Sequence, residues 1–280
     1  IMIIGIDLGN YSTKTSEKVI FDSKCTSNSL LARNPFECES NTYYIGEGSY
    51  DTEYRKVKKK NIRVMFLYAL ALSTNDINNR CVVGLPISQY KADREEMKQL
   101  LLQPRMNVVT LNGIQRKLYI EDVEVYPEGL ISVEDGILVD IGGRTTEVAL
   151  VENFKVTSSF SVPEGTLNLY SDFANLINTH YGLDLKQSDA ERIIRHGLKI
   201  YGMVADVTFA QDAFRSFVEN LVSQIQIKYP VKTLPVTILG GGGQLLFNPI
   251  KKRIPNSTLA ENPVFANALL FKKVGEAKWL

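Results

Sequence analysis

The sequence feature that most constrains the fold is an internal repeat of a strand–turn–strand pattern. Residues 4–13 read IGIDLGNYST, and residues 137–146 read ILVDIGGRTT. Asp7 and Asp140 occupy corresponding places 133 positions apart (140 minus 7), and the offset is constant throughout the two segments. Each copy has an apolar strand with an aspartate near its end, a turn containing glycine, hydroxyl residues and a second strand. The repeat predicts a chain built from two related halves.

Strand and helix patterns alternate along the whole chain, which indicates an α/β fold. Apolar runs predict strands at Thr13–Phe21, Arg80–Leu85, Gly136–Ile141 and Val236–Leu239. A run that is apolar on every face within residues 54–72 predicts a buried helix, and further helices are expected at Ala92–Leu102, Leu167–His180, Ser188–Ile200, Ala210–Lys228 and Val264–Val274. The 280 residues suit two ordinary domains or one large domain, and a hydrophobic content of 44% supports a full core.

Charge, apolar runs and cysteines limit where such a protein works and what it binds. The net charge of +1 argues against a general nucleic-acid binder. The longest apolar run, Val64–Leu72, is shorter than the ~20 residues that span a bilayer. The first residues carry no basic segment or small-residue cleavage site, and Cys25, Cys38 and Cys81 are scattered. We therefore expect a cytoplasmic protein with no membrane partner and no direct nucleic-acid partner.

The residues of the two turns are suited to binding phosphate. Glycine lets the backbone approach a polyphosphate and turn its N–H groups towards the oxygens. Hydroxyl donors follow each turn at Ser12, Thr13, Thr145 and Thr146. A carboxylate at a strand end, such as Asp7 or Asp140, can hold Mg²⁺, usually through water. One copy alone would be interpreted as a plain hairpin turn, whereas two copies in register favour a nucleotide clamped by both.

A third segment, Pro235–Gln244, carries an apolar strand into four glycines and then a helical pattern. Bare backbone at this place would let a flat ring or a ribose lie against the chain, although a flexible loop is the alternative. Two other nucleotide motifs are missing from the sequence. It contains no G-x-x-x-x-G-K-(S/T), which excludes a P-loop, and no complete G-x-G-x-x-G, which disfavours a dinucleotide site.

These segments resemble the three nucleotide loops of one superfamily. Asp7–Lys14 resembles the phosphate-one loop of the actin, sugar-kinase and heat-shock-chaperone ATPases, Asp140–Thr146 resembles their phosphate-two loop, and Leu239–Gly243 resembles their adenosine loop. Val82–Tyr90 and Tyr126–Gly129 are similar to segments of the plasmid-segregation actins of the ParM and AlfA type. The resemblance implies an actin-like fold of two RNase H-like lobes around a nucleotide cleft. It places lobe I at residues 1–135, completed by 264–280 and carrying a small outer subdomain at about 23–62. Lobe II would span 136–263 with a reduced outer subdomain.

The resemblance also implies a function. Such a protein would bind ATP and Mg²⁺, polymerise head-to-tail, and hydrolyse ATP to segregate plasmid or phage DNA through a DNA-binding adaptor protein. The alternatives are a small-molecule kinase of the same superfamily and a non-polymerising actin-like scaffold. The basic run Arg55–Lys60 could contact DNA, but the near-zero net charge favours a solvated or filament-contact face.

The site residues implied by the resemblance fall into three groups. Glu128 would orient or polarise the attacking water, and Asp7 and Asp140 would organise Mg²⁺ and its waters. Lys14 is expected either to approach the phosphates or to be a solvated strand residue, and Glu191 would contact ribose or base. The expected nucleotide-binding residues are Asp7, Gly9, Asn10, Tyr11, Ser12, Thr13, Lys14, Asp140, Gly142, Gly143, Arg144, Thr145, Thr146, Gly165, Thr166, Glu191, Gly240, Gly241, Gly242 and Gln244.

Overall fold

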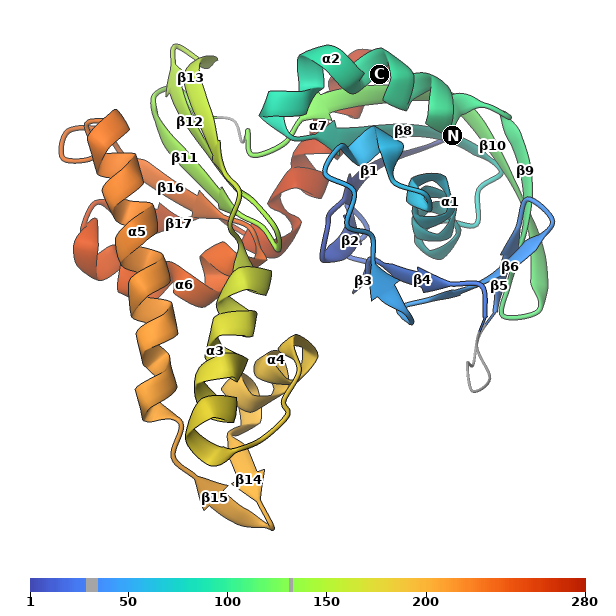
Figure 1. The fold of residues 1–280 in the computed structure, drawn as a ribbon. Coiled ribbons are helices and arrows are strands. Elements are labelled where there is room, and N and C mark those ends of the chain that lie inside the picture. Colours follow the sequence, from blue (N-terminus) through green and yellow to red (C-terminus); the bar gives the residue numbers. More distant parts are fainter. Residues whose placement is uncertain (29–34, 131–132) are drawn as a thin grey trace. The chain divides into compact units, whose positions relative to one another are not determined.

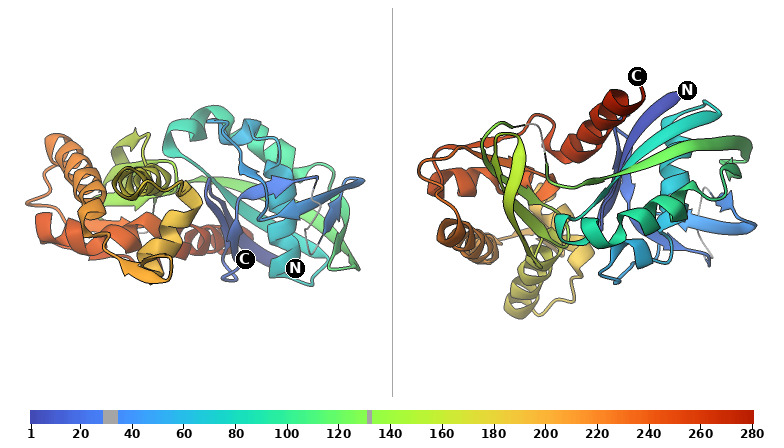
Figure 2. Two further views of the ribbon diagram at one scale, coloured as in Figure 1. Left: turned by 60° about the horizontal axis from the view of Figure 1, so that its bottom comes forward. Right: turned by 90° about the horizontal axis from the view of Figure 1, so that it is seen from above.

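The computed structural model describes residues 1–28, 35–130 and 133–280, so residues 29–34 of the expected outer subdomain lie outside the described residues. The chain forms two compact units. Unit 1 contains Ile1–Val133 and Glu261–Leu280, and unit 2 contains Glu134–Ala260. Both ends of the chain therefore belong to unit 1, where they lie side by side (Figure 2). Each unit is a mixed α/β body (Figure 1).

The described residues of unit 1 build a sheet of ten strands in the order β3-β2-β1-β8-β10-β9-β5-β6-β4-β7. The strands are β1 (Met2–Leu8), β2 (Ser12–Thr15), β3 (Ile20–Asp22), β4 (Lys24–Thr26), β5 (Phe36–Cys38), β6 (Asn41–Ile45), β7 (Ser49–Tyr50), β8 (Asn78–Leu85), β9 (Met106–Leu111) and β10 (Ile114–Pro127). The helices are η1 (Lys56–Lys58), α1 (Ile62–Ser73), α2 (Ile87–Leu102), η3 (Pro263–Phe265) and α7 (Ala266–Trp279).

The core of unit 1 surrounds α1, and the sheet curves around this helix (Figure 1). Phe66, Leu67 and Leu70 are fully buried, which confirms the prediction of a buried helix here. The helices α2 and α7 pack against β10, β8 and β1. Helix α7 approaches β1 very closely, because a Cβ added at Gly5 would lie only 2.0 Å from the backbone oxygen of Ala268.

The described residues of unit 2 build a sheet of five strands in the order β13-β12-β11-β16-β17, and a separate two-stranded hairpin. The strands are β11 (Gly136–Ile141), β12 (Thr146–Glu152), β13 (Lys155–Val162), β14 (Leu198–Ile200), β15 (Met203–Ala205), β16 (Val236–Leu239) and β17 (Ser257–Leu259). The helices are α3 (Thr166–Tyr181), α4 (Gln187–His196), η2 (Thr208–Gln211), α5 (Asp212–Lys228) and α6 (Gly241–Arg253).

The two units repeat one topology, as the sequence repeat predicts. In unit 1, β1 pairs antiparallel with β2 and parallel with β8, and β2 pairs antiparallel with β3. In unit 2, β11 pairs antiparallel with β12 and parallel with β16, and β12 pairs antiparallel with β13. The two units therefore share the same strand pairing as well as a repeated sequence.

Two predicted elements differ from the structure. The predicted strand Thr13–Phe21 is divided into β2 and β3 by a turn in which Lys18 has a φ of 61°. The predicted helix Ser188–Ile200 is wrong at its end, because α4 stops at His196 and Gly197 follows with a φ of 76°. The next residues form the β14–β15 hairpin around Tyr201 and Gly202, which both have positive φ, as a two-residue type I′ turn requires.

Within the described ranges, no helix combines the length and apolar content that crossing a membrane requires.

Candidate functional site

The first glycine turn joins β1 to β2 and depends on Gly9. Leu8 and Thr13 are paired across the hairpin, so the chain reverses within four residues. A Cβ at Gly9 would lie 2.4 Å from the backbone oxygen of Ser12, a separation that side-chain carbons do not tolerate. Glycine is therefore required here by close packing of the turn on itself.

Lys14 and Asp7 face each other across this hairpin. They are directly paired in the strand register, and the Lys14 Nζ lies 3.5 Å from the Asp7 Oδ2. Their side chains are only 13% and 9% exposed, respectively. Lys14 also donates a hydrogen bond of 3.3 Å to the backbone oxygen of Ser12. Lys14 is thus not a solvated strand residue, and its ammonium lies at the base of the first turn.

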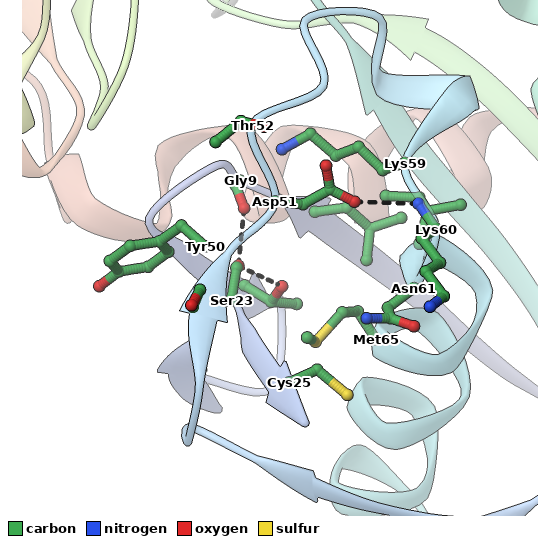
Figure 3. Close-up of a pocket in the computed structure, with 14 residues that line it drawn as sticks. Gly9, Ser23, Cys25, Tyr50, Asp51, Thr52, Lys59, Lys60, Asn61 and Met65 are labelled. Atoms are coloured by element: carbon green, nitrogen blue, oxygen red, sulfur yellow. Dashed lines mark hydrogen bonds between the residues drawn. The ribbon is translucent and has the colours of Figure 1, made fainter. Parts of the chain in front are cut away.

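Residues from other segments of unit 1 support the first turn. Ser23 donates a 2.6 Å hydrogen bond to the backbone oxygen of Gly9, and its hydroxyl lies 3.0 Å from the hydroxyl of Thr13 (Figure 3). Asn10 accepts a hydrogen bond from the ammonium of Lys59. The ring of Tyr11 stacks on Tyr50, with 5.3 Å between centroids. The turn is therefore held in place by side chains from distant parts of unit 1.

A cavity of about 390 Å³ opens beside this turn, wholly within unit 1 (Figure 3). Its polar lining comes from the turn, from the segment around β7 and from the start of α1. The lining residues are Leu8, Gly9, Thr13, Ser23, Cys25, Ser49, Tyr50, Asp51, Thr52, Lys59, Lys60, Asn61, Ile62 and Met65. Burial raises the pKa of the Cys25 thiol to about 11, so this thiol is protonated at neutral pH.

The second glycine turn, Gly142–Thr145, joins β11 to β12 and is covered by the start of α3. Thr166 donates its backbone N–H to Gly142 at 3.0 Å, and Leu167 donates to Gly143 at 2.8 Å. A Cβ at Gly165 would lie 2.6 Å from backbone atoms of both turn glycines. Gly165 and Thr166 therefore belong to the same cluster as the turn.

The β16–α6 connection completes this cluster in unit 2. Gly240 has a φ of 86°, and a Cβ there would lie 2.4 Å from the Asp140 Oδ1. A Cβ at Gly242 would lie 2.5 Å from the side chain of Ile141 and 2.7 Å from that of Thr166. The glycines that follow Gly240 form the first turn of α6, where the backbone N–H groups of a helix have no acceptor within the helix itself. Such a terminus is suited to a phosphate or another polar group of a ligand.

Other expected residues of unit 2 lie at the turn or farther away. Thr146 is fully buried and donates to the backbone oxygen of Glu164, while Arg144 and Thr145 are half-buried in the turn. Gln244 is exposed on the first turn of α6. Glu191 lies on α4, where it pairs with Arg195 of the same helix.

Glu191 also lies close to Tyr170 on α3. The pKa of Tyr170 is raised to about 12, first by burial and then by the negative charge of Glu191. Two neighbours of Glu191 therefore lie on α3 and α4, and its expected contact with ribose or base stays a prediction.

Glu128 stands at the end of β10 in a closely packed place. Its backbone N–H donates to Leu85 at 2.8 Å, and a Cβ at Gly84 would lie 2.7 Å from the Glu128 Cγ. The next residue, Gly129, donates its N–H to the Asn267 side chain of α7. The two segments similar to plasmid-segregation actins thus meet around Glu128.

Sequence reasoning missed the partner of Glu128. The carboxylate forms an ion pair with Lys56, whose side chain is only 3% exposed. The expectation of a solvated face for the basic run Arg55–Lys60 is therefore wrong for Lys56. Other members also have partners: Arg55 pairs with Asp93, Lys58 pairs with Glu96, and Lys59 contacts Asn10. No local signal marks Lys56, because its partner is 72 positions away.

The carboxylates suit a magnesium ion held mainly by water and phosphate. In the described part of the chain, no three His, Cys, Asp or Glu side chains gather as a metal-binding group. Mg²⁺ in nucleotide sites is commonly held by one or two carboxylates together with substrate phosphates. Asp7 and Asp140 each lie next to a turn that is packed closely around glycine residues. These two carboxylates fit that set of magnesium ligands.

Two family models match the sequence, one in each half. Residues 5–130 match the N-terminal domain of actin-like proteins, and residues 138–252 match the C-terminal part of the archaeal actin homologue MreB-like family. No curated protein matches the sequence.

Solved structures share the fold over nearly the whole chain. The archaeal actin homologue Ta0583, in its complex with ADP, is 18% identical with a TM-score of 0.83, over 99% of this chain and 100% of that chain. A ParM from Clostridium botulinum, solved as a 15-stranded filament, is 19% identical with a TM-score of 0.81, over 98% and 99%. The AlfA filament from the B. subtilis plasmid pLS32 is 14% identical with a TM-score of 0.65, over 100% and 99%. The chain is therefore an actin-like protein, with an actin-like N-terminal half followed by an MreB-like C-terminal half.

Proposed function

We propose that this actin-like protein binds Mg–ATP and hydrolyses it while assembling into filaments. The observation that carries the proposal is the duplicated hairpin, in which an aspartate precedes a turn whose glycines leave bare backbone. A similar archaeal protein has been solved with ADP, which supports a nucleotide as the ligand.

The residues of the two turns would hold the phosphates. Gly9 and the hydroxyls after it would present donors from unit 1, and Gly142 and Gly143 would do so from unit 2. The N-terminus of α6, which begins beside Asp140, would contact the nucleoside part of the ligand through glycine backbone. Asp7 and Asp140 would hold Mg²⁺ through water, and the bound ion would supply positive charge next to the phosphates.

Glu128 would orient the attacking water. Phosphoryl transfer of this kind needs positioning and charge stabilisation more than covalent chemistry. The packing of Glu128 between Gly84, Leu85 and Lys56 restricts where its carboxylate can point. A carboxylate with a defined direction is suited to accept a hydrogen bond from a water molecule.

Self-association would build the filament. Solved relatives include filaments of ParM, of Alp12 and of AlfA. The β14–β15 hairpin adds a feature of this chain, because Tyr201, Met203 and Val204 are 99%, 73% and 82% exposed. Large apolar side chains gathered on one exposed hairpin are typical of an interaction surface. A head-to-tail contact that does not close produces an open filament.

The biological use that we propose is segregation of plasmid or phage DNA. Four members of the basic run Arg55–Lys60 already contact partners within unit 1, so we do not assign DNA binding to this run. An adaptor protein would instead link the filament to DNA.

Light scattering with Mg–ATP, followed by negative-stain microscopy of the same sample, tests the assembly. We expect a lag, a critical concentration and visible filaments. Phosphate release should rise cooperatively with protein concentration, and Glu128→Ala should slow it while nucleotide binding and assembly are retained. Scattering that stays flat over a wide range of concentrations would overturn the filament proposal and direct attention to small-molecule phosphorylation.

A further inference from the structure

We propose that Lys56 is a positioning residue for Glu128, and that the segment Arg55–Lys60, which we call the strap, links Glu128 to the first glycine turn. The inference rests on the proposed hydrolysis and assigns a new part of the chain to it. The strap lies between β7 and α1, and the sequence marks it only as a basic run.

The Lys56–Glu128 pair is buried. The two side chains are 3% and 13% exposed, and the Lys56 Nζ also lies 3.4 Å from the backbone oxygen of Gly84. Taking both charges out of water costs several kcal/mol per ion, so a buried pair is often no better for stability than apolar residues of the same size. The buried Lys56–Glu128 pair is therefore better explained by the carboxylate that it positions than by a gain in stability.

The strap is anchored on α2. Lys56 donates its backbone N–H to the Gln89 Oε1 at 2.9 Å, and the Gln89 Nε2 donates to the backbone oxygen of Tyr54 at 3.0 Å. Arg55 pairs with Asp93, which is 1% exposed. Val57 is 4% exposed and adds an apolar anchor. Gln89 therefore holds the backbone on both sides of Arg55, and the contacts of the Lys56 ammonium with Gly84 and Glu128 start from an anchored segment.

The strap also reaches the first glycine turn. Lys59, three residues after Lys56, donates to the Asn10 side chain in the turn that follows Asp7. One short segment thus contacts both the residue proposed to orient water and the turn proposed to hold phosphate. A shift of the turn would be transmitted to Glu128 through a few anchored residues.

The consequence for hydrolysis is geometric. Lys56 contacts the Glu128 Oε1, which restricts rotation of the carboxylate and defines the direction from which it can accept a water proton. A displacement of about 1 Å in a catalytic group can cost about 100-fold in rate. We therefore expect Lys56→Met to slow phosphate release by about 100-fold in a single turnover, with nucleotide affinity changed by less than about threefold.

The control is Lys58→Met, which removes the same charge from the same strap. Lys58 pairs with Glu96 on α2, both side chains are 48% exposed, and neither lies at Glu128. Its phosphate release should match that of the wild type, because exposed pairs contribute little. Light scattering should show that both variants assemble.

A double variant separates positioning from a general structural role. If Lys56 acts through Glu128, Lys56→Met should slow phosphate release no further when Glu128→Gln is already present. An additive loss in the double variant, or a wild-type rate in Lys56→Met, would overturn the role of Lys56. A wild-type protein that releases no phosphate would instead overturn the proposed hydrolysis, and the positioning role with it.

If Lys56→Met does not fold, Lys56→Arg tests the positioning role of Lys56 instead. It keeps a buried positive charge, but its guanidinium cannot occupy the place of the Lys56 ammonium. A folded Lys56→Arg protein with unchanged nucleotide affinity and slowed phosphate release supports the positioning role, and a wild-type rate contradicts it.

Discussion

The two glycine-turn hairpins share their backbone pairing but differ in the residue that faces the aspartate. Asp7 is paired across its hairpin with Lys14, whereas Asp140 is paired with Glu147 at the same offset of 133 (147 minus 14). All four residues are buried or nearly so, with Asp140 at 8% and Glu147 at 6% exposure. The first hairpin thus pairs an acidic residue with a basic one, whereas the second places two carboxyl groups opposite each other. Duplication has preserved the shape of the hairpin while its electrostatic character has diverged.

The turns themselves differ in tightness. A Cβ would lie 2.4 Å from the opposite backbone oxygen at Gly9, but 3.0 Å from it at Gly142, 133 positions later. The first turn therefore admits only glycine, while the second is limited more by the start of α3 that covers it. The same motif can be constrained by its own backbone in one unit and by a neighbouring helix in the other.

The largest effect is expected from giving the first hairpin the charge pattern of the second. Lys14→Glu places a carboxylate opposite Asp7 and removes the ammonium beside it, so we expect stability to fall by about 3–5 kcal/mol in urea unfolding. Lys14→Met, which adds no like charge, is the matched control and should lose less. Equal stability of Lys14→Glu and the wild type would show that the charge opposite Asp7 does not affect the free energy of unfolding.

The second comparison concerns the turn glycines. We expect Gly9→Ala to cost about 2–3 kcal/mol and Gly142→Ala about 1 kcal/mol, because only the first substitution forces a backbone clash below 3 Å. Thermal unfolding of the two variants measures the difference. A reversed order would show that the turn in unit 2 is the tighter one.

A smaller effect is expected from removing one of the opposed charges in unit 2. Glu147 accepts a hydrogen bond from Ser161, and an amide oxygen can accept the same bond in Glu147→Gln. Stability should change by less than about 1 kcal/mol, since the lost charge faces a like charge. A loss of several kcal/mol on urea unfolding would show that the carboxylate of Glu147 is essential to unit 2.

The smallest effect concerns the cavity beside the first hairpin, which is lined by Cys25. Burial raises the pKa of the Cys25 thiol to about 11, and the thiolate is the reactive form. Alkylation by iodoacetamide should therefore be slow at pH 8 and accelerate as the pH rises towards 11. The pKa of Cys38 is raised to about 12, chiefly by burial, so Cys25 should react before it. Rapid alkylation at pH 7 would indicate that the cavity beside Gly9 opens.

Sequence patterns predict the parts of the fold whose signals are local. The strands β11 and β16 have the bounds that their apolar runs predict, because glycine and proline mark their ends. The break between β2 and β3 has no such signal, since the turn at Lys18 contains neither glycine nor proline. Strand β14 is wrongly predicted as the end of a helix, because its apolar and polar residues continue the pattern of α4 past Gly197.

The candidate site divides in the same way. The three glycine segments are each contiguous in sequence, so the sequence alone reveals their residue types and spacing. The packing of Gly240 against Asp140 and the pairing of Lys56 with Glu128 join residues far apart in the chain. Neither follows from a pattern in the sequence, because a long-range contact leaves no mark on the residues nearby.

The close packing of α7 on β1 has a consequence for synthesis. A ribosome makes β1 before unit 2 and α7 after it. Domains generally fold as units while the chain emerges, and unit 2 is continuous from Glu134 to Ala260. Unit 1 must wait for its last helix to cover the face at Gly5. In this chain, the unit that is begun first is therefore the one that is completed last.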